Sequence, residues 1–187
     1  MKKFTVKDIM VPLEEYATIH QNATLFDAVL ALEKAQNEYC EPEVQYKHRA
    51  ILVYDDRKKV IGKLSQLDII RSLEPKYRHA SDSDGRIMAS GFSKEFLRSM
   101  VEQFSLWDKP LTDICKKATD IKAKDCMYVP EPGEYVNAED SMDMAIHQLV
   151  IGQHQSLLVT NNGDIVGILR LTDVFKEVVN AMKACNL

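Results

Sequence analysis

The chain has 187 residues, of which 45% are hydrophobic and 28% are charged, and its formal net charge is −4. This composition is typical of a globular protein, and the negative charge argues against nucleic-acid binding, which needs a basic surface. The apolar runs are strand-sized, far shorter than the roughly 20 residues of a membrane-spanning helix, and the N-terminus lacks the apolar core of a signal peptide. Four scattered cysteines favour reduced thiols. We therefore expect a cytoplasmic protein that binds neither nucleic acid nor membrane.

The first part of the chain predicts the order β-α-β-β-α. The helical spacing of Leu25, Ala28 and Leu32 indicates an amphipathic helix, and the polar stretch 55–59 indicates a turn between two strands. Pro75 ends the second helix. The predicted elements are a strand over Ala17–His20, a helix over Thr24–Gln36, strands over Ala50–Tyr54 and Lys59–Leu64, and a helix over Ser65–Leu73.

A linker follows that resembles neither neighbouring part. Its small and polar residues 78–91 predict a mobile surface loop, and Phe92–Phe104 predicts a helix with Ser93 as its N-cap. One side of this helix is apolar, the Phe96–Phe104 face. That face packs on its own chain or covers a partner, and amphipathicity alone does not separate the two.

The last part of the chain predicts the same β-α-β-β-α order. The triplet Asn161-Asn162-Gly163 between two apolar stretches is a hairpin-turn signal. The predicted elements are a strand near Tyr135, a helix over Ser141–Ile151, strands over Ser156–Thr160 and Asp164–Leu169, and a helix over Leu171–Ala184.

The two parts are copies of one another. Residues 60–70, with Gly62, Ser65 and Asp68, are echoed by residues 165–175, and residues 6–12 and 48–53 have counterparts at 123–130 and 154–159. Each copy has a strand that runs into a helix, where free backbone N–H groups suit a phosphate and an aspartate can accept hydrogen bonds from ribose hydroxyls. Ser65 and Asp68 also fit a helix-capping box, and the two roles are compatible. The repeat predicts paired binding sites.

These motifs resemble a tandem pair of CBS domains, called a Bateman module. The resemblance rests on Gly62-x-x-Ser65-x-x-Asp68, on its counterpart with Gly167, Arg170 and Asp173, and on the strands before them. It implies an α+β fold in which two β-α-β-β-α units pack about a pseudo-two-fold axis, with clefts that bind adenine nucleotides. It places the first CBS domain at residues 1–74, a linker with an amphipathic helix at 75–119, and the second CBS domain at 120–187.

The resemblance also implies the ligand-binding residues. They are Thr18, His48, Arg49, Ser65 and Asp68 in the first copy, and His154, Arg170 and Asp173 in the second. Arg170 departs from the family's Ser/Thr at this position, so it can grip phosphate, fill the cleft or pair with a carboxylate. We expect unequal sites, with the first matching the family pattern better.

The sequence shows no catalytic motif of a nucleotide-using enzyme, protease or hydrolase, and no histidine at metal-ligand spacing. The leading hypothesis is an energy-sensing regulatory module, not an enzyme, that binds AMP, ADP or ATP, forms a homodimer and signals in trans to an unknown effector protein. One alternative is a dimeric interaction module that binds no nucleotide and works through the Phe96–Phe104 face. Another is a sensor of a different adenosyl ligand such as S-adenosylmethionine.

Overall fold

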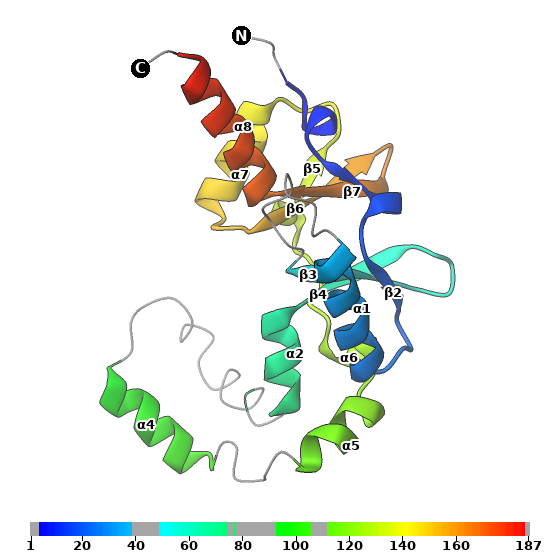
Figure 1. Cartoon of the computed structure of the whole chain (residues 1–187), viewed down its shortest axis with the longest axis vertical. Helices are drawn as coiled ribbons and strands as arrows, with labels where there is room; N and C mark the ends of the chain where they lie inside the picture. Colours follow the sequence, from blue (N-terminus) through cyan, green and yellow to red (C-terminus); the bar gives the residue numbers. More distant parts are fainter. Residues whose placement is uncertain (1–3, 39–48, 75–76, 78–92, 106–111, 186–187) are drawn as a thin grey trace.

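A computed structural model describes residues 4–38, 49–74, 77, 93–105 and 112–185. It has an α+β fold with two small sheets, one of strand order β2-β3-β4 and one of order β1-β7-β6-β5 (Figure 1). The strands are β1 (Val11–Pro12), β2 (Thr18–His20), β3 (Ala50–Tyr54), β4 (Val60–Ser65), β5 (Tyr135–Asn137), β6 (Ser156–Asn161) and β7 (Asp164–Arg170).

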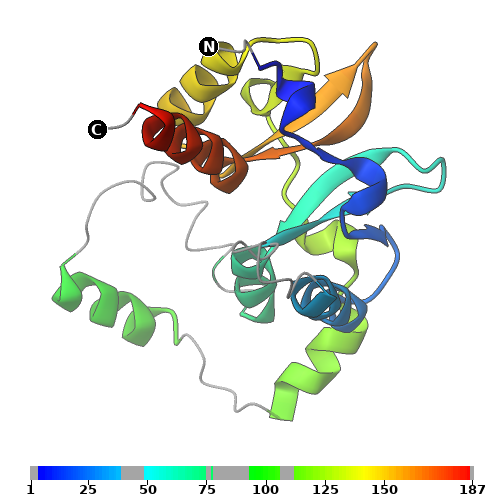
Figure 2. The ribbon, with the colours of Figure 1, turned by 45° about the horizontal axis from the view of Figure 1, so that its top comes forward.

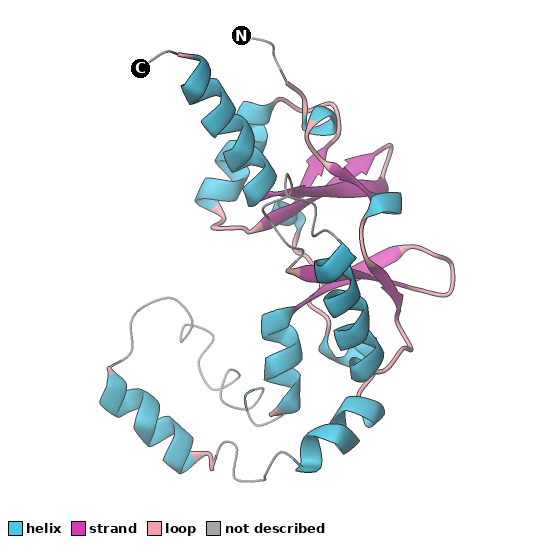
Figure 3. Cartoon of the chain, in the orientation of Figure 1, coloured by secondary structure: helices cyan, strands magenta, loops and turns pink. Residues whose placement is uncertain are grey.

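Most of the helices lie beside these sheets, whereas α4 (Lys94–Gln103) stands apart (Figure 3). The helices are α1 (Leu25–Glu38), α2 (Gln66–Leu73), α4, α5 (Thr112–Asp120), α6 (Ala123–Cys126), α7 (Met142–Ile151) and α8 (Leu171–Ala184), with short 3-10 helices at Val6–Asp8, Leu13–Glu15 and Pro132–Glu134. Among the described residues, none of the helices combines the length and apolar character needed to cross a membrane.

The predicted repeat is confirmed strand by strand. In each copy the first strand pairs with the second in parallel, and the second pairs with the third in antiparallel. Ala50 lies opposite Ser65 in the first copy, and Ser156 lies opposite Arg170 in the second. The hairpin turn between β6 and β7 has φ values of 50° at Asn162 and 88° at Gly163, the left-handed backbone that the sequence predicts there.

The central strands are buried on both faces. Ile51 and Val53 of β3 pack toward α1, whereas Leu52 between them packs against the other sheet. β6 repeats this alternation, with Leu158 in the same inter-sheet cluster as Leu52. Figure 2 shows the two sheets packed face to face with helices outside them. Burial on both faces explains the unbroken apolar runs of the sequence.

The segment that leads into each copy packs on the other copy. We call residues 5–12 and 123–130 the leading segments. Val6 N donates to Asp140 O at 3.0 Å, and β1 pairs with β7 of the second sheet. In the reverse sense, Lys63 of β4 and Tyr128 exchange backbone hydrogen bonds of 2.9 and 2.8 Å. The two copies therefore exchange their leading segments.

The glycine of each copy permits this close approach. A Cβ on Gly62 would lie 2.6 Å from Met127 Sδ and 2.9 Å from Tyr128 O. A Cβ on Gly167 would lie 2.5 Å from Val11 O. A side chain at either position would collide with the leading segment that crosses it.

The linker contains one predicted and one unpredicted helix. The helix predicted at Phe92–Phe104 is α4, capped by Ser93, whose Oγ accepts a hydrogen bond from Phe96 N at 3.2 Å. It lies apart from both sheets in Figures 1 and 2. α5 was not predicted, and it packs against α1 and α2 with Lys117 Nζ donating to Leu73 O at 2.8 Å. Phe92 and the predicted surface loop at 78–91 lie outside the described residues.

Candidate functional site

The strand-to-helix junction of the first copy is a capping box. Asp68 Oδ2 accepts hydrogen bonds from Ser65 N at 2.9 Å and Ser65 Oγ at 2.6 Å, and Ser65 Oγ accepts one from Asp68 N at 3.2 Å. The capping interpretation is therefore confirmed. The second carboxylate oxygen, Oδ1, faces Arg71 Nη1 at 3.6 Å.

Asp68 also lines a cavity of about 240 Å³. One wall is α2 of the first copy, and the other is the leading segment of the second copy, because the two copies exchange these segments. The lining residues are Asp68, Arg71, Ser72, Asp125, Cys126, Met127 and Tyr128. Asp68 thus has a structural role through Oδ2 and a place on the wall of a cavity.

Two other candidate residues of the first copy, Thr18 and Arg49, lie toward the same end of the sheet as Ser65. Thr18 opens β2 and Arg49 immediately precedes β3, and both are exposed. Arg49 O accepts the backbone hydrogen bond of Gln66 N at 3.2 Å, which ties Arg49 to the start of α2. Within the described part of the chain, the cavity lining includes neither Thr18 nor Arg49 nor Ser65. His48 lies outside the described residues.

The second junction is closed by its own arginine. Arg170 Nε donates to Asp173 Oδ2 and Nη2 donates to Oδ1, both at 2.6 Å, so the guanidinium takes both carboxylate oxygens. Of the three roles left open for Arg170, the structure shows pairing with a carboxylate. Both side chains are mostly buried, 14% and 16% exposed. The expected inequality of the two junctions is thus present in their hydrogen bonding.

A buried acidic residue that the sequence did not reveal lies beside the first cavity. Glu134 is only 3% exposed, and its Oε1 accepts a hydrogen bond from Lys63 Nζ of β4. The Tyr128 hydroxyl donates to the same carboxylate, and Glu131 N donates to Oε2 at 3.1 Å. His154 Nδ1 lies 3.9 Å from Oε1. His154 is therefore next to Glu134 rather than among the residues that line the first cavity.

The hydrogen bonds in this cluster shift two pKa values in opposite directions. Burial alone would raise the pKa of Glu134, but donors from Lys63, Tyr128 and the backbone outweigh it and hold that pKa below its ordinary value. Burial, together with the hydrogen bond to the Glu134 carboxylate, raises the pKa of Tyr128. Glu134 is accordingly an anion and Tyr128 a neutral donor near neutral pH.

Glu134 follows Glu131-Pro132-Gly133, which has the composition of a surface turn. Its burial depends on the docking of the first copy's β4 against this turn, so no local pattern marks it. Lys63 carried only a weak signal, as a single cation inside an apolar strand.

The family follows from a comparison with family models. The model described as "CBS domain" matches residues 6–75 and again residues 120–180. The chain belongs to the CBS domain family. The two matched regions contain the two copies, so the protein is a tandem CBS pair, as the sequence predicted.

Solved structures with this fold cover nearly all of the chain. The structure of CBSX2 in complex with AMP is 16% identical, covers 95% of this chain and 97% of its own, and has a TM-score of 0.59. The CBS domain of the bacterial CNNM/CorC family Mg2+ transporter in complex with ATP is 15% identical, covers 94% and 87%, and has a TM-score of 0.59.

A putative acetoin utilization protein (AcuB) from Vibrio cholerae is 15% identical, covers 98% of this chain and 96% of its own, and has a TM-score of 0.59. These likenesses show the fold of a CBS pair. No curated protein sequence matches the chain.

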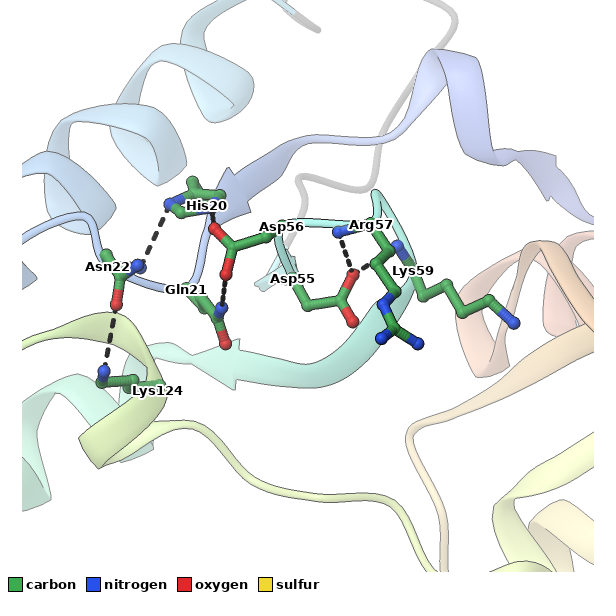
Figure 4. A network of polar contacts seen from close by, with 8 residues as sticks. All are labelled: His20, Gln21, Asn22, Asp55, Asp56, Arg57, Lys59 and Lys124. Atoms are coloured by element: carbon green, nitrogen blue, oxygen red, sulfur yellow. Dashed lines mark hydrogen bonds and ion pairs between the residues drawn. The ribbon is translucent and has the colours of Figure 1, made fainter.

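A second polar network occupies the opposite end of the first CBS unit (Figure 4). The His20 ring and the Gln21 amide bind the two carboxylate oxygens of Asp56 at 3.0 and 2.9 Å, and Lys124 Nζ donates to the Asn22 side chain at 3.0 Å. His20 ends β2 and Asp56 lies in the β3–β4 turn, whereas Ser65 and Asp68 lie where β4 ends. This network links the β3–β4 hairpin and the leading segment of the second copy to the turn after β2.

Proposed function

We propose that this CBS pair is a regulatory module that senses an adenine nucleotide (AMP, ADP or ATP) in the cavity beside Asp68. The observation that carries the proposal is the Asp68 carboxylate on the cavity wall, at the N-terminus of α2. Such a carboxylate accepts hydrogen bonds from ribose hydroxyls, and the helix N-terminus favours phosphate. Similar CBS structures that hold AMP or ATP support this ligand class.

In this proposal the cavity beside Asp68 is the principal binding site, which we call the first cleft. The family resemblance assigns Thr18, His48, Arg49 and Ser65 to the same site as Asp68. The second site contains His154, Arg170 and Asp173, and its carboxylate is already bound by Arg170 at two oxygens. A ribose there would have to displace a charge-assisted bidentate pair, so we expect the second site to be weak or empty.

The output of the module is binding to other proteins rather than catalysis. We propose a cytoplasmic homodimer that acts in trans on an effector protein whose affinity changes with the bound nucleotide. Exposed apolar side chains on the outer helices support self-association. They include Phe26 and Leu30 on α1, Leu67 and Ile70 on α2, and Phe175 on α8.

Titration calorimetry with AMP, ATP and S-adenosylmethionine tests the ligand, because a ribose-binding carboxylate serves all three. Asp68→Asn is compared with the matched Asp173→Asn, since each removes one charge at equivalent positions. We expect Asp68→Asn to weaken binding about 100-fold or more, as loss of a charge-assisted hydrogen bond does, and Asp173→Asn to leave it within about threefold. A folded wild type that binds none of the three ligands would refute the sensor.

One observation favours a second function, a dimeric interaction module that needs no nucleotide. Phe96, Leu97 and Val101 of α4 remain 42%, 48% and 46% exposed. If this face holds a partner or a second copy, Phe96→Asp with Met100→Asp abolishes self-association or partner capture in ultracentrifugation, and Asp68→Asn changes nothing. An unchanged oligomer in the double variant would remove the support for this function.

A further inference from the structure

Tyr128 is held at its backbone and at its hydroxyl, and the two bonding partners belong to different CBS units. Its backbone exchanges hydrogen bonds with Lys63 on β4 of the first unit. Its hydroxyl donates to Glu134, which ends the 3-10 helix before β5 of the second unit. The Lys63 ammonium lies 5.1 Å from the centre of the Tyr128 ring, within the range of a cation–π contact. The ring therefore spans the junction between the units.

Tyr128 also lines the cavity that contains Asp68, and it is still 38% exposed. Glu134 is buried and does not line that cavity among the described residues. A ligand that fills the cavity would therefore contact Tyr128, whose hydroxyl is hydrogen-bonded to Glu134. Among the described residues, neither β5 nor the 3-10 helix before it contributes to the lining.

We propose that Glu134 is a positioning residue which, by holding the Tyr128 hydroxyl, makes the affinity of the first cleft depend on the docking of the second CBS unit. The inference rests on the proposed function, because it concerns nucleotide affinity. Its basis is geometric: a carboxylate held by Lys63 of one unit fixes the cavity wall from the other unit. We call Lys63, Tyr128 and Glu134 the inter-unit clasp.

The inter-unit clasp couples nucleotide binding in the first unit to the docking of the second unit. If docking of the second unit changes nucleotide affinity by some factor, nucleotide binding must change the docking equilibrium by the same factor. The element that receives the change is β5, because Glu134 directly precedes Tyr135. Among the described strands, β5 pairs with β6 alone, so it is an edge strand. An edge strand can shift without breaking the centre of a sheet.

A double-mutant cycle on the full chain tests the clasp with AMP and ATP as probes. Tyr128→Phe removes only the hydroxyl, Glu134→Ala removes the acceptor, and Glu134→Gln keeps an oxygen that accepts from Tyr128. We expect Tyr128→Phe and Glu134→Ala each to weaken binding about tenfold, and the double variant to be no weaker than either single one. Glu134→Gln should bind nucleotide nearly as tightly as the wild type, because its amide oxygen still accepts from Tyr128. If only the charge of Glu134 mattered, Glu134→Gln would bind as weakly as Glu134→Ala.

Tyr54→Phe is the matched tyrosine control, because Tyr54 contacts His20 at the opposite end of the first unit. It should leave the affinity unchanged. Amide hydrogen exchange supplies a second readout: nucleotide should slow exchange of β5 residues 135–137 in the wild type and not in Tyr128→Phe. Unchanged nucleotide affinity in both single variants would overturn the inter-unit clasp. So would a double variant whose loss of affinity equals the product of the two single losses.

Failure of the clasp and failure of the sensor give different results. If the wild type binds nucleotide and the variants follow the additive pattern, the sensor stands and the clasp is wrong. If the wild type binds neither AMP nor ATP while its melting curve shows a folded protein, the sensor fails and the clasp fails with it.

Discussion

The two strand-to-helix junctions share a backbone and differ in one side chain. Ala50 lies opposite Ser65 in one sheet, and Ser156 lies opposite Arg170 in the other, so Ser65 and Arg170 occupy equivalent positions. Ser65 donates to one oxygen of Asp68, whereas Arg170 donates to both oxygens of Asp173. The serine hydroxyl therefore bonds one carboxylate oxygen, and the guanidinium bonds both.

This comparison shows how a duplicated fold can give two differently bonded junctions on the same strand pairing. A serine cap stabilises α2 through hydrogen bonds with Asp68, whose Oδ1 faces Arg71 Nη1 at 3.6 Å. Arg170 instead forms a bidentate ion pair with Asp173 within the junction. One position per copy thus decides how the aspartate is bonded within its own junction.

The largest expected effect concerns the contact between the units. Lys63→Met leaves the Glu134 carboxylate buried without its ammonium partner, and loss of one member of a buried pair costs about 3 kcal/mol or more. Lys7→Met is the matched control, because Lys7 also reaches from one copy to the other, in an exposed pair with Glu139 at 3.7 Å. It should cost about 0.5 kcal/mol or less. Urea unfolding measures the free energy of unfolding of both variants, and equal losses would contradict a buried inter-unit clasp.

The same contact predicts a pH dependence. The folded pKa of Glu134 lies below its ordinary value, so the unfolded chain binds the proton first as the pH falls. The stabilisation is therefore fully present above the unfolded value of about 4.3 and is lost as the pH falls through the folded value. The difference in stability between the wild type and Glu134→Gln should shrink below about pH 4. A difference that stays constant down to pH 3 would mean that the charge of Glu134 does not contribute.

The two glycines sharpen the comparison between the copies. Gly167→Ala brings a methyl group against the backbone oxygen of Val11, and Gly62→Ala first meets the flexible end of Met127. We expect a loss of about 3 kcal/mol at Gly167 and about 1.5 kcal/mol at Gly62, within the usual range for overpacking. Thermal or urea unfolding ranks the two, with Gly133→Ala as a control where an added methyl group meets no atom within 4 Å. The opposite ranking would mean that β1 yields more easily than the Met127 side chain.

Exchanging the two junction residues tests whether this single position decides the site. Arg170→Ser frees the Asp173 carboxylate and should add a second nucleotide-binding event in calorimetry. Ser65→Arg should abolish the first event, because the new guanidinium can take both oxygens of Asp68 as Arg170 does in the other copy. We expect each exchange to change stability by only about 1–2 kcal/mol, since an ion pair and a cap are exchanged. Unchanged stoichiometry in both variants would mean that residues elsewhere set the inequality.

Much of this fold could be predicted from the sequence, because local patterns are strong where burial is regular. The strand Ala50–Tyr54 and the helix Leu171–Ala184 have the predicted bounds. The continuous apolar run of β3 indicates a strand buried on both faces, and the structure places it between α1 and the second sheet. The repeat then transferred each assignment from one copy to the other.

What the sequence did not predict depends on contacts between distant segments. α5 is short and polar, and its packing on α1 and α2 decides its helical state more than its composition does. The exchange of leading segments brings Tyr128 to Lys63, and the burial of Glu134 follows from it. For the site, the resemblance named Asp68 and Ser65, but not the cavity walls at residues 125–128. The ligand-binding roles that it implies remain predictions for all eight residues, Thr18, His48, Arg49, Ser65, Asp68, His154, Arg170 and Asp173.

The smallest expected effect isolates the capping role of Ser65 from its place near the ligand. Ser65→Ala removes the hydroxyl that bonds Asp68 N and Asp68 Oδ2, and we expect a loss of about 1 kcal/mol. Ser141→Ala at the start of α7 is the matched control, because Ser141 accepts a single longer bond of 3.4 Å from Met144 N, and it should cost about 0.5 kcal/mol.

If Ser65 serves only as a cap, nucleotide affinity in Ser65→Ala should fall no further than in Ser141→Ala. A larger loss, measured by calorimetry where both variants remain folded, would assign Ser65 to the ligand as well. The capping box would then hold the aspartate in the orientation that a ribose requires, and one pair of side chains would both start the helix and form the site.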